Sequence, residues 1–224
     1  LELGETDSAD PATLSDFLVS GLLKAPAERA WVLVTGHGDG WNGLAFDATT
    51  GPQRRMSLSG LRGALEAAAA VHGAPIDVVQ FDACRMGTVE VAAELAGAAR
   101  TLVASREAVP DAGHPYSALR CLSEADPEAS TRALVSRLVT DYVQAYVEGV
   151  STQDRAYVGT SVASAALDLG RLPPLLSALS RLREAVQAER PRGFDCVEVA
   201  EIAARAGRVA GAEAGQGTLV EKAS

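Results

Sequence analysis

The chain of 224 residues is 47% hydrophobic and 22% charged, a composition typical of a globular protein with one substantial core. Its formal net charge of −9 argues against nucleic acid as the main partner and disfavours docking to an anionic membrane surface. No run of 18 apolar residues is present, and the three cysteines lack the spacing of a disulfide framework or a zinc site.

Apolar periodicity and turn residues predict an alternation of strands and helices. In chain order, we expect a helix over 11–24, a strand over 30–35, a glycine-rich loop over 36–55, a helix over 57–71, a strand over 76–81, a helix over 89–99, a strand over 101–105, a loop over 106–116, a helix over 126–146, a strand within 157–167, a helix over 172–189, a linker over 188–194 and a last short helix over 197–205. Strand–helix–strand units of this kind favour a parallel sheet with right-handed crossovers.

The stretch 76–87 (IDVVQFDACRMG) joins a buried strand to a candidate nucleophile. IDVVQF lacks polar alternation, as does a parallel strand that is covered on both faces. Cys84 follows the carboxyl end of this strand, where open α/β sheets bind their ligands. Taken alone, Cys84 is better explained as a small core residue, because free cysteine is among the most buried residue types.

A second stretch, 31–40 (WVLVTGHGDG), places His37 in the same way after an apolar run. His37 precedes Cys84 by 47 residues, close to the roughly 50 that separate the histidine and cysteine of caspases. Cysteine becomes a useful thiolate near neutral pH when a base such as imidazole lies beside it. Two reactive side chains at the ends of two strands therefore indicate a Cys–His pair rather than packing alone.

These motifs resemble those of the clostripain-like cysteine peptidases, family C11 of the caspase-fold clan. The matching segments are GETDSADPATLSDFL (4–18), WVLVTGHGDGW (31–41), SLSGLRGAL (57–65), FDACRMGTVEVAAEL (81–95) and VASREAVPDAGHPY (103–116). The resemblance implies a caspase-like three-layer α/β sandwich with a mostly parallel central sheet and helices on both faces. The chain departs from the family at Arg85, Arg106 and His114, where leucine, an acidic residue and often an aromatic residue are usual.

The resemblance implies a cysteine endopeptidase whose dyad requires no third carboxylate and no cofactor. Cys84 would attack the peptide carbonyl to give a thioester, and His37 would protonate the leaving amine. The oxyanion needs fixed backbone donors, and we expect the N–H groups of Gly38 and Cys84 to provide them. The partners implied are protein or peptide substrates with Arg or Lys at P1.

Two acidic residues are candidates for binding that basic P1 side chain. Asp82 lies two residues before Cys84, where a carboxylate at the floor of the pocket can pair with a guanidinium or ammonium group. The family associates this aspartate with cleavage after Arg or Lys; the alternative is that Asp82 only caps the strand-to-helix turn. Asp111, in the loop after the next strand, is either a second ligand for the same cation or an ordinary turn residue after Pro110.

Arg54 and Arg55 lie in the turn-rich segment DATTGPQRRMS, of the kind that proteases cut. Family members are often matured by cleavage in this region, so we expect a zymogen that is cut there by itself or by an activating protease; the alternative is a basic loop tip with no role. An upstream segment of its own precursor is a further expected partner. Some family members depend on calcium, and Asp39 and Asp47 are the acidic loop residues that could bind it as an activator, without the spacing of a calcium loop.

We therefore expect an acidic N-terminal arm (1–10), a clostripain-type peptidase domain (11–206) and a C-terminal tail (207–224). Family members usually carry a strand and a helix before the first matching segment, so the chain is expected to be a fragment, a processed chain or a short member. A catalytically inactive caspase-fold binding module is the alternative function, and a flavodoxin-like ligand-binding domain is another. The Ala- and Arg-rich sequence suggests a bacterial source, with the cytoplasm slightly favoured over secretion.

Overall fold

The computed structural model describes residues 4–49, 51, 54–116, 128–153 and 155–189. The chain divides into two compact units, Leu1–Pro174 and Leu175–Ser224. Of the second unit, the structure describes the part of helix α6 (Leu172–Glu189) that follows Pro174. Three predicted features lie outside the described residues: the linker beyond 189, the helix 197–205 and the tail from 207. The helix predicted over 126–146 begins only at Thr131, after Ser130.

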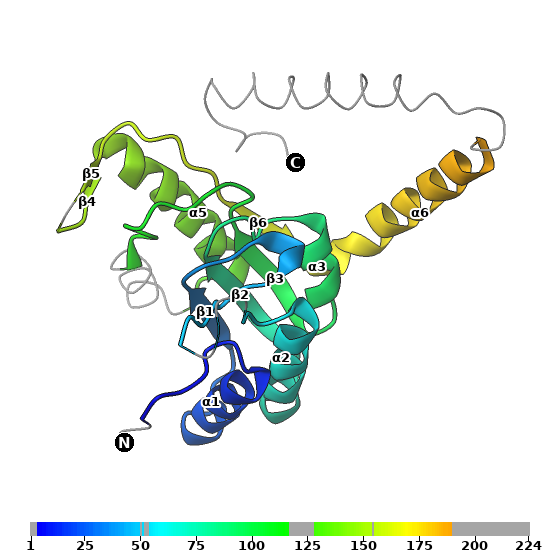
Figure 1. The fold of residues 1–224 in the computed structure, drawn as a ribbon, viewed down its shortest axis with the longest axis horizontal. Helices are drawn as coiled ribbons and strands as arrows, with labels where there is room; N and C mark the ends of the chain where they lie inside the picture. The colour runs from blue at the N-terminus through cyan, green and yellow to red at the C-terminus, as the bar shows by residue number, and fades with distance from the viewer. Residues whose placement is uncertain (1–3, 50, 52–53, 117–127, 154, 190–224) are drawn as a thin grey trace. The chain divides into compact units, whose positions relative to one another are not determined.

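A four-stranded sheet forms the centre of the first unit (Figure 1). Three of its strands, β1 (Trp31–Thr35), β2 (Ile76–Asp82) and β3 (Ala99–Ala104), run parallel to one another. The fourth, β6 (Ala165–Asp168), pairs antiparallel with β3 at the edge, so the spatial order is β1-β2-β3-β6. The sheet is therefore mostly parallel, as the strand–helix alternation predicts.

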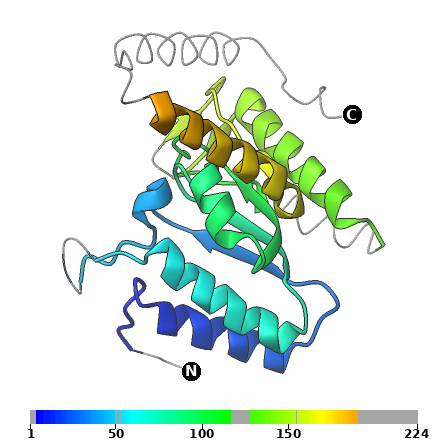
Figure 2. The ribbon, with the colours of Figure 1, turned by 90° about the vertical axis from the view of Figure 1, so that its right-hand side faces the viewer.

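Two helices make the crossovers between the parallel strands. Helix α2 (Leu58–His72) connects β1 to β2, and α3 (Val89–Leu95) connects β2 to β3. Because consecutive neighbouring strands joined by right-handed crossovers place both connections on one face, α2 and α3 cover the same side of the sheet. Helix α1 (Pro11–Lys24) lies beside α2 (Figure 2).

Helix α5 (Thr131–Glu148) covers the other face of the sheet (Figure 1). Val78 of β2 and Val103 of β3 pack against Val135 and Leu138 of this helix. Because side chains alternate along a strand, the residues next to Val78 in β2 and next to Val103 in β3 point to the opposite face, which α2 and α3 cover. The core therefore has helices on both sides of the sheet, as the three-layer prediction requires.

Local capping groups explain where the helices begin. The Ser57 side chain accepts a hydrogen bond from the Gly60 N–H at the start of α2, and Ser130 does the same for Ala133 in α5. Helix α2 ends at Gly73, whose φ of 80° lies in the left-handed region that glycine favours.

Within the predicted strand region 157–167, only the end at 165–167 forms part of a strand of the main sheet. Tyr157 belongs to a separate two-stranded hairpin of β4 (Val150–Ser151) and β5 (Ala156–Tyr157), and only β6 joins the main sheet. Gly159, with φ of 61°, turns the chain away directly after β5. Helix α3 is also shorter than the predicted 89–99, because the chain turns at Gly97 (φ 92°) before β3.

Candidate active site

His37 and Cys84 follow equivalent positions at the carboxyl ends of two adjacent parallel strands. In the β1–β2 ladder Thr35 is the partner of Asp82, and the Gly36 N–H donates to the Asp82 carbonyl at 3.1 Å. His37 and Cys84 each lie two residues beyond that last pair. Parallel pairing thus delivers both side chains to the same edge of the sheet, where α/β proteins place their chemistry.

The loops that carry these two residues pack directly on one another at Gly38. A Cβ on Gly38 would lie 2.7 Å from the Cys84 carbonyl oxygen and 2.8 Å from the sulfur of Met86. Both distances are below van der Waals contact, so only glycine fits this position without displacing the Cys84 loop. Gly38 therefore fixes how closely the His37 loop approaches Cys84.

The thiol of Cys84 is half-buried and is bound by the loop that follows β3. The Val109 N–H donates to Cys84 Sγ at 3.3 Å, and the thiol in turn lies 3.8 Å from the Val109 carbonyl oxygen. The His37 imidazole is exposed, with its ring edge-on to Phe46 at 6.5 Å between centroids. Within the part of the chain that the structure describes, no hydrogen bond joins His37 to Cys84.

The two expected oxyanion donors lie on these same loops. Neither the Gly38 N–H nor the Cys84 N–H donates to another group among the described residues. Their neighbours are engaged: the Asp39 N–H donates to Gly43, and the Arg85 N–H donates to Glu107. Two backbone donors on loops in contact are thus left for a ligand, the arrangement that an oxyanion requires.

The Asp82 carboxylate is held by the segment that follows Asp111. Its Oδ2 accepts from the His114 backbone N–H at 3.2 Å and from the Tyr116 hydroxyl. Its Oδ1 is buried and has no partner among the described residues. A buried carboxylate oxygen without a donor is costly, so Asp82 has capacity for one more hydrogen-bond donor.

Asp111 is exposed and its carboxylate accepts from the Tyr157 hydroxyl. Tyr146 of α5 lies close to both candidate carboxylates: burial and the charges of Asp82 and Asp111 raise the pKa of Tyr146 to about 12. The two carboxylates therefore act on a common neighbour, but each is engaged by a different tyrosine, Tyr116 for Asp82 and Tyr157 for Asp111.

The sequence argument assigns no role to three residues near Cys84 and Asp82: Val109, His114 and Tyr116. His114 is buried and stacks on Tyr142 of α5, with 4.0 Å between ring centroids. Tyr142 is buried within the helix predicted over 126–146, but periodicity does not reveal which loop packs on that helix. The signal available was the aromatic and polar content of the segment 113–116 (GHPY).

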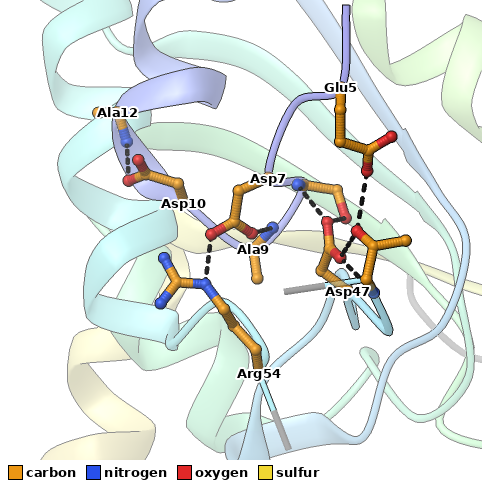
Figure 3. A network of polar contacts seen from close by, with 9 residues as sticks. Glu5, Asp7, Ala9, Asp10, Ala12, Asp47 and Arg54 are labelled. Carbon is orange, nitrogen blue, oxygen red and sulfur yellow. Dashed lines mark hydrogen bonds and ion pairs between the residues drawn. The ribbon is translucent and has the colours of Figure 1, made fainter. Parts of the chain in front are cut away.

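The N-terminal arm holds the segment in which processing is expected (Figure 3). The buried Asp47 carboxylate accepts from the backbone and side chain of Ser8, at 2.9 and 3.2 Å, and from Thr49. The guanidinium of Arg54 forms an ion pair with Asp7, and the Arg54 carbonyl accepts from the Asp47 N–H at 3.1 Å. Arg54 and Arg55 are both exposed.

The two candidate calcium ligands, Asp39 and Asp47, make other contacts among the described residues. Asp39 pairs with Arg85 and Asn42, and the Asp47 carboxylate is occupied as described above. The described residues contain no group of three or more metal-ligating side chains.

Two further features lie away from these residues. None of the described helices is long and apolar enough to span a membrane. A cavity of about 240 Å³ lies between α1 and the amino end of β1, the end opposite to His37.

Solved structures similar to this chain include two C11 proteases. A secreted C11 cysteine protease from Bacteroides thetaiotaomicron, in complex with an irreversible peptide inhibitor, gives a TM-score of 0.62 at 23% identity, over 77% of this chain and 49% of that one. An inactive zymogen C11 protease from Parabacteroides distasonis gives 0.56 at 21% identity, over 77% and 43%. This chain thus spans about half the length of those proteins. No curated protein matches it.

The likeness to these structures confirms the caspase-like α/β fold. The model of the clostripain family, peptidase family C11, matches residues 3–205. That range contains every described strand and helix, together with His37, Gly38, Asp82 and Cys84. The chain therefore belongs to the clostripain family.

Proposed function

We propose that the chain is a cysteine endopeptidase that cleaves after basic residues. The observation that supports the reaction is the delivery of His37 and Cys84 to one edge of the sheet by the paired strands β1 and β2. A thiol and an imidazole on adjacent loops, with unpaired backbone N–H groups on the same loops, are the groups that acyl transfer requires.

The reaction proceeds in two halves. Cys84 transfers its proton to His37, and the sulfur attacks the peptide carbonyl carbon to form a C–S bond, while the N–H groups of Gly38 and Cys84 bind the oxyanion. His37 then returns the proton to the nitrogen of the breaking C–N bond, which leaves a thioester and a free amine. Water attacks the thioester, His37 takes and returns its proton, and the acid leaves with the thiol restored.

This reaction requires Cys84 to move from its contact with Val109 toward His37. The Val109 N–H donates to the Cys84 sulfur at 3.3 Å, and no hydrogen bond joins His37 to Cys84 among the described residues. In uncomplexed enzymes catalytic hydrogen bonds are often formed only once substrate binds. Cleavage beside Arg54 or Arg55 would release the segment that follows His37 and let this loop rearrange.

The preference for Arg or Lys rests on Asp82. Its buried Oδ1 has no donor among the described groups, and a P1 guanidinium or ammonium would supply one with the opposite charge. Asp111 is the weaker candidate because it is exposed and bonded to Tyr157. Calcium as an activator is a separate proposal that no described ligand set supports, and assays with and without a chelator test it.

The test compares fluorogenic peptides that end in Arg, Lys, Asp or Leu, using the wild type and Cys84→Ala. Turnover of the basic peptides, lost in Cys84→Ala, is the expected result, and Asp82→Asn should remove the basic preference while leaving Cys84 reactive to iodoacetamide. Turnover after Asp would keep the dyad and overturn the role of Asp82. No turnover even after cleavage at Arg55 would favour the alternative function, a catalytically inactive caspase-fold binding module.

A further inference from the structure

Beside Asp82 the structure places a second buried group whose polar atoms lack partners. His114 is 3% exposed, and neither Nδ1 nor Nε2 of its ring has a hydrogen-bond partner among the described residues. Asp82 Oδ1 is likewise buried and has no hydrogen-bond partner among the described residues. Leaving several buried polar atoms unpaired costs about 1–3 kcal/mol each. A carboxylate oxygen that needs a donor, beside an imidazole with no partner, marks a site that is completed by a ligand.

The position of His114 is fixed from three sides. Its backbone N–H donates to Asp82 Oδ2 at 3.2 Å, and its ring stacks on Tyr142 at an angle of 16°. The residue before it, Gly113, accepts from the Tyr146 hydroxyl at 3.0 Å. A Cβ on Gly113 would lie only 2.3 Å from Asp82 Oδ2, so this backbone is pressed against the carboxylate.

The charges around His114 come from few groups. Asp82 faces it from the end of β2, Tyr142 and Tyr146 from α5, and Tyr116 from its own segment. Burial lowers the pKa of His114, and the negative charge of Asp82 opposes that effect. Burial raises the pKa of each of the three tyrosines, so they stay neutral at physiological pH. Near neutral pH the imidazole is uncharged and able to accept a hydrogen bond.

We propose that His114 is a specificity-determining residue of the P1 pocket, which admits a basic side chain when its ring is neutral and rejects that side chain when its ring is protonated. This inference rests on the proposed function. The neutral ring accepts one N–H of a guanidinium while Asp82 accepts another, since a guanidinium carries five donors. The protonated ring is itself a cation beside Asp82, so it offsets the negative charge of the carboxylate and repels a second cation.

Tyr116 marks where the basic group would bind. Its exposed side chain donates to Asp82 Oδ2, so Oδ1 is the carboxylate oxygen that is left for a guanidinium. The incoming side chain would then add a charged donor at Oδ1 next to the neutral Tyr116 hydroxyl on Oδ2.

The test measures kcat/KM between pH 5 and 8 for two peptides that differ only at P1, arginine in one and citrulline in the other. Citrulline has nearly the shape of arginine without its charge, so the Arg/citrulline ratio cancels any titration of His37 or Cys84. In the wild type the ratio should fall as the pH falls, by up to about tenfold per pH unit below the His114 pKa, through KM more than kcat.

Two variants isolate the imidazole. His114→Phe keeps the stacking on Tyr142 but cannot accept or carry a proton; its ratio should be independent of pH and lower than that of the wild type at pH 8. His114→Gln keeps an acceptor without the charge; its ratio should be independent of pH and close to the wild-type value at pH 8. Equal pH dependence of the ratio in all three proteins would overturn the role of His114.

A binding measurement on the Cys84→Ala protein does not depend on turnover. The chain has three histidines, so the C2 proton of each can be assigned by NMR from single variants. Benzamidine, a cationic mimic of the arginine side chain, should lower the pKa of His114. If no basic peptide is cleaved, the proposed function fails; if basic peptides are cleaved and benzamidine leaves His114 unchanged, only this inference fails.

Discussion

An ion pair joins the two loops that carry the candidate dyad: Arg85 Nη1 lies 3.0 Å from Asp39 Oδ1. Arg85 follows Cys84 directly, and Asp39 lies two residues after His37. Arg85 has φ of 62°, a left-handed conformation that a residue with a side chain seldom adopts, so the pair coincides with a constrained backbone beside the nucleophile. The contact is therefore well placed to set the distance between the two loops.

Asp39→Asn should lower kcat several-fold with a smaller effect on KM, because it removes the charge that aligns the loops and keeps the side-chain oxygen for Asn42. Asn42 and Arg85 lower the pKa of Asp39 below its ordinary 3.8, so the pair is present above that pH and is lost only as the pH falls through the lowered pKa. Salt, rather than pH near neutrality, should therefore weaken it. Glu66→Gln, which breaks the exposed Arg62–Glu66 pair, is the control. An unchanged kcat and salt dependence in Asp39→Asn would show that the pair has no positioning role.

Gly38→Ala should abolish most activity. The new methyl group would lie 2.7 Å from the Cys84 carbonyl oxygen, so the two loops must separate and the donor N–H of residue 38 must move. We expect kcat to fall by about 100-fold, as when an oxyanion donor is lost, and stability to fall by about 1–3 kcal/mol through overpacking. Kinetics and denaturant unfolding measure the two effects.

Gly63→Ala is the matched control, because a Cβ there meets nothing within 4 Å and the residue is exposed in helix α2. It should leave kcat unchanged and stabilise the protein by about 0.5–1 kcal/mol. Normal activity in Gly38→Ala would mean that the loops can separate without harm to the reaction.

The sequence predicts the part of this fold that local pattern determines. The apolar runs before His37 and Cys84 are β1 and β2, and their parallel pairing follows from the helix between them. Contacts between segments far apart in the chain could not be predicted. Nothing in periodicity shows that Val109 bonds to the Cys84 sulfur, or that His114 stacks on Tyr142, because these contacts join a loop to elements far along the chain. The edge strand β6 begins within the predicted region 157–167, but its bounds could not be predicted, because AALD is short and mostly exposed.

Release of the N-terminal arm should expose the processing segment. In a Cys84→Ala background, which cannot cut itself, Asp47→Ala removes the acceptor of Ser8 and Thr49 and frees the arm. Local opening then becomes easier, so trypsin should cut after Arg54 and Arg55 at least about ten times faster. Mass spectrometry of the fragments with time gives the rates.

Asp7→Ala removes the ion pair with the Arg54 guanidinium and the hydrogen bond from the Ala9 N–H, while Ser8 still binds Asp47. Its effect should be smaller and confined to cleavage after Arg54. Equal cleavage rates in Asp47→Ala and the parent would show that the arm does not protect this segment.

Loss of the hydroxyl group should change the stability of the protein differently at two neighbouring tyrosines of α5, Tyr146 and Tyr142. The Tyr146 hydroxyl donates to the Gly113 carbonyl, so Tyr146→Phe should cost about 1 kcal/mol and loosen the segment that carries His114. The Tyr142 hydroxyl is buried without a partner among the described residues, so Tyr142→Phe should be neutral or stabilising. Urea unfolding of the two variants at pH 7 measures the difference.

Tyr142 and Tyr146 also determine how the stability of the protein should change above pH 10. Burial raises the pKa of Tyr146 to about 12 and raises that of Tyr142 further above its ordinary 10.0. The unfolded chain therefore loses these protons first, so the stability that is present below pH 10 falls as the pH rises from 10 through the folded pKa values. Tyr142→Phe removes one of the two titrations and should make the loss of thermal stability above pH 10 less steep than in the wild type. Parallel curves for the two proteins would mean that Tyr142 ionises as readily in the folded state as in the unfolded chain, which its complete burial beside His114 does not allow.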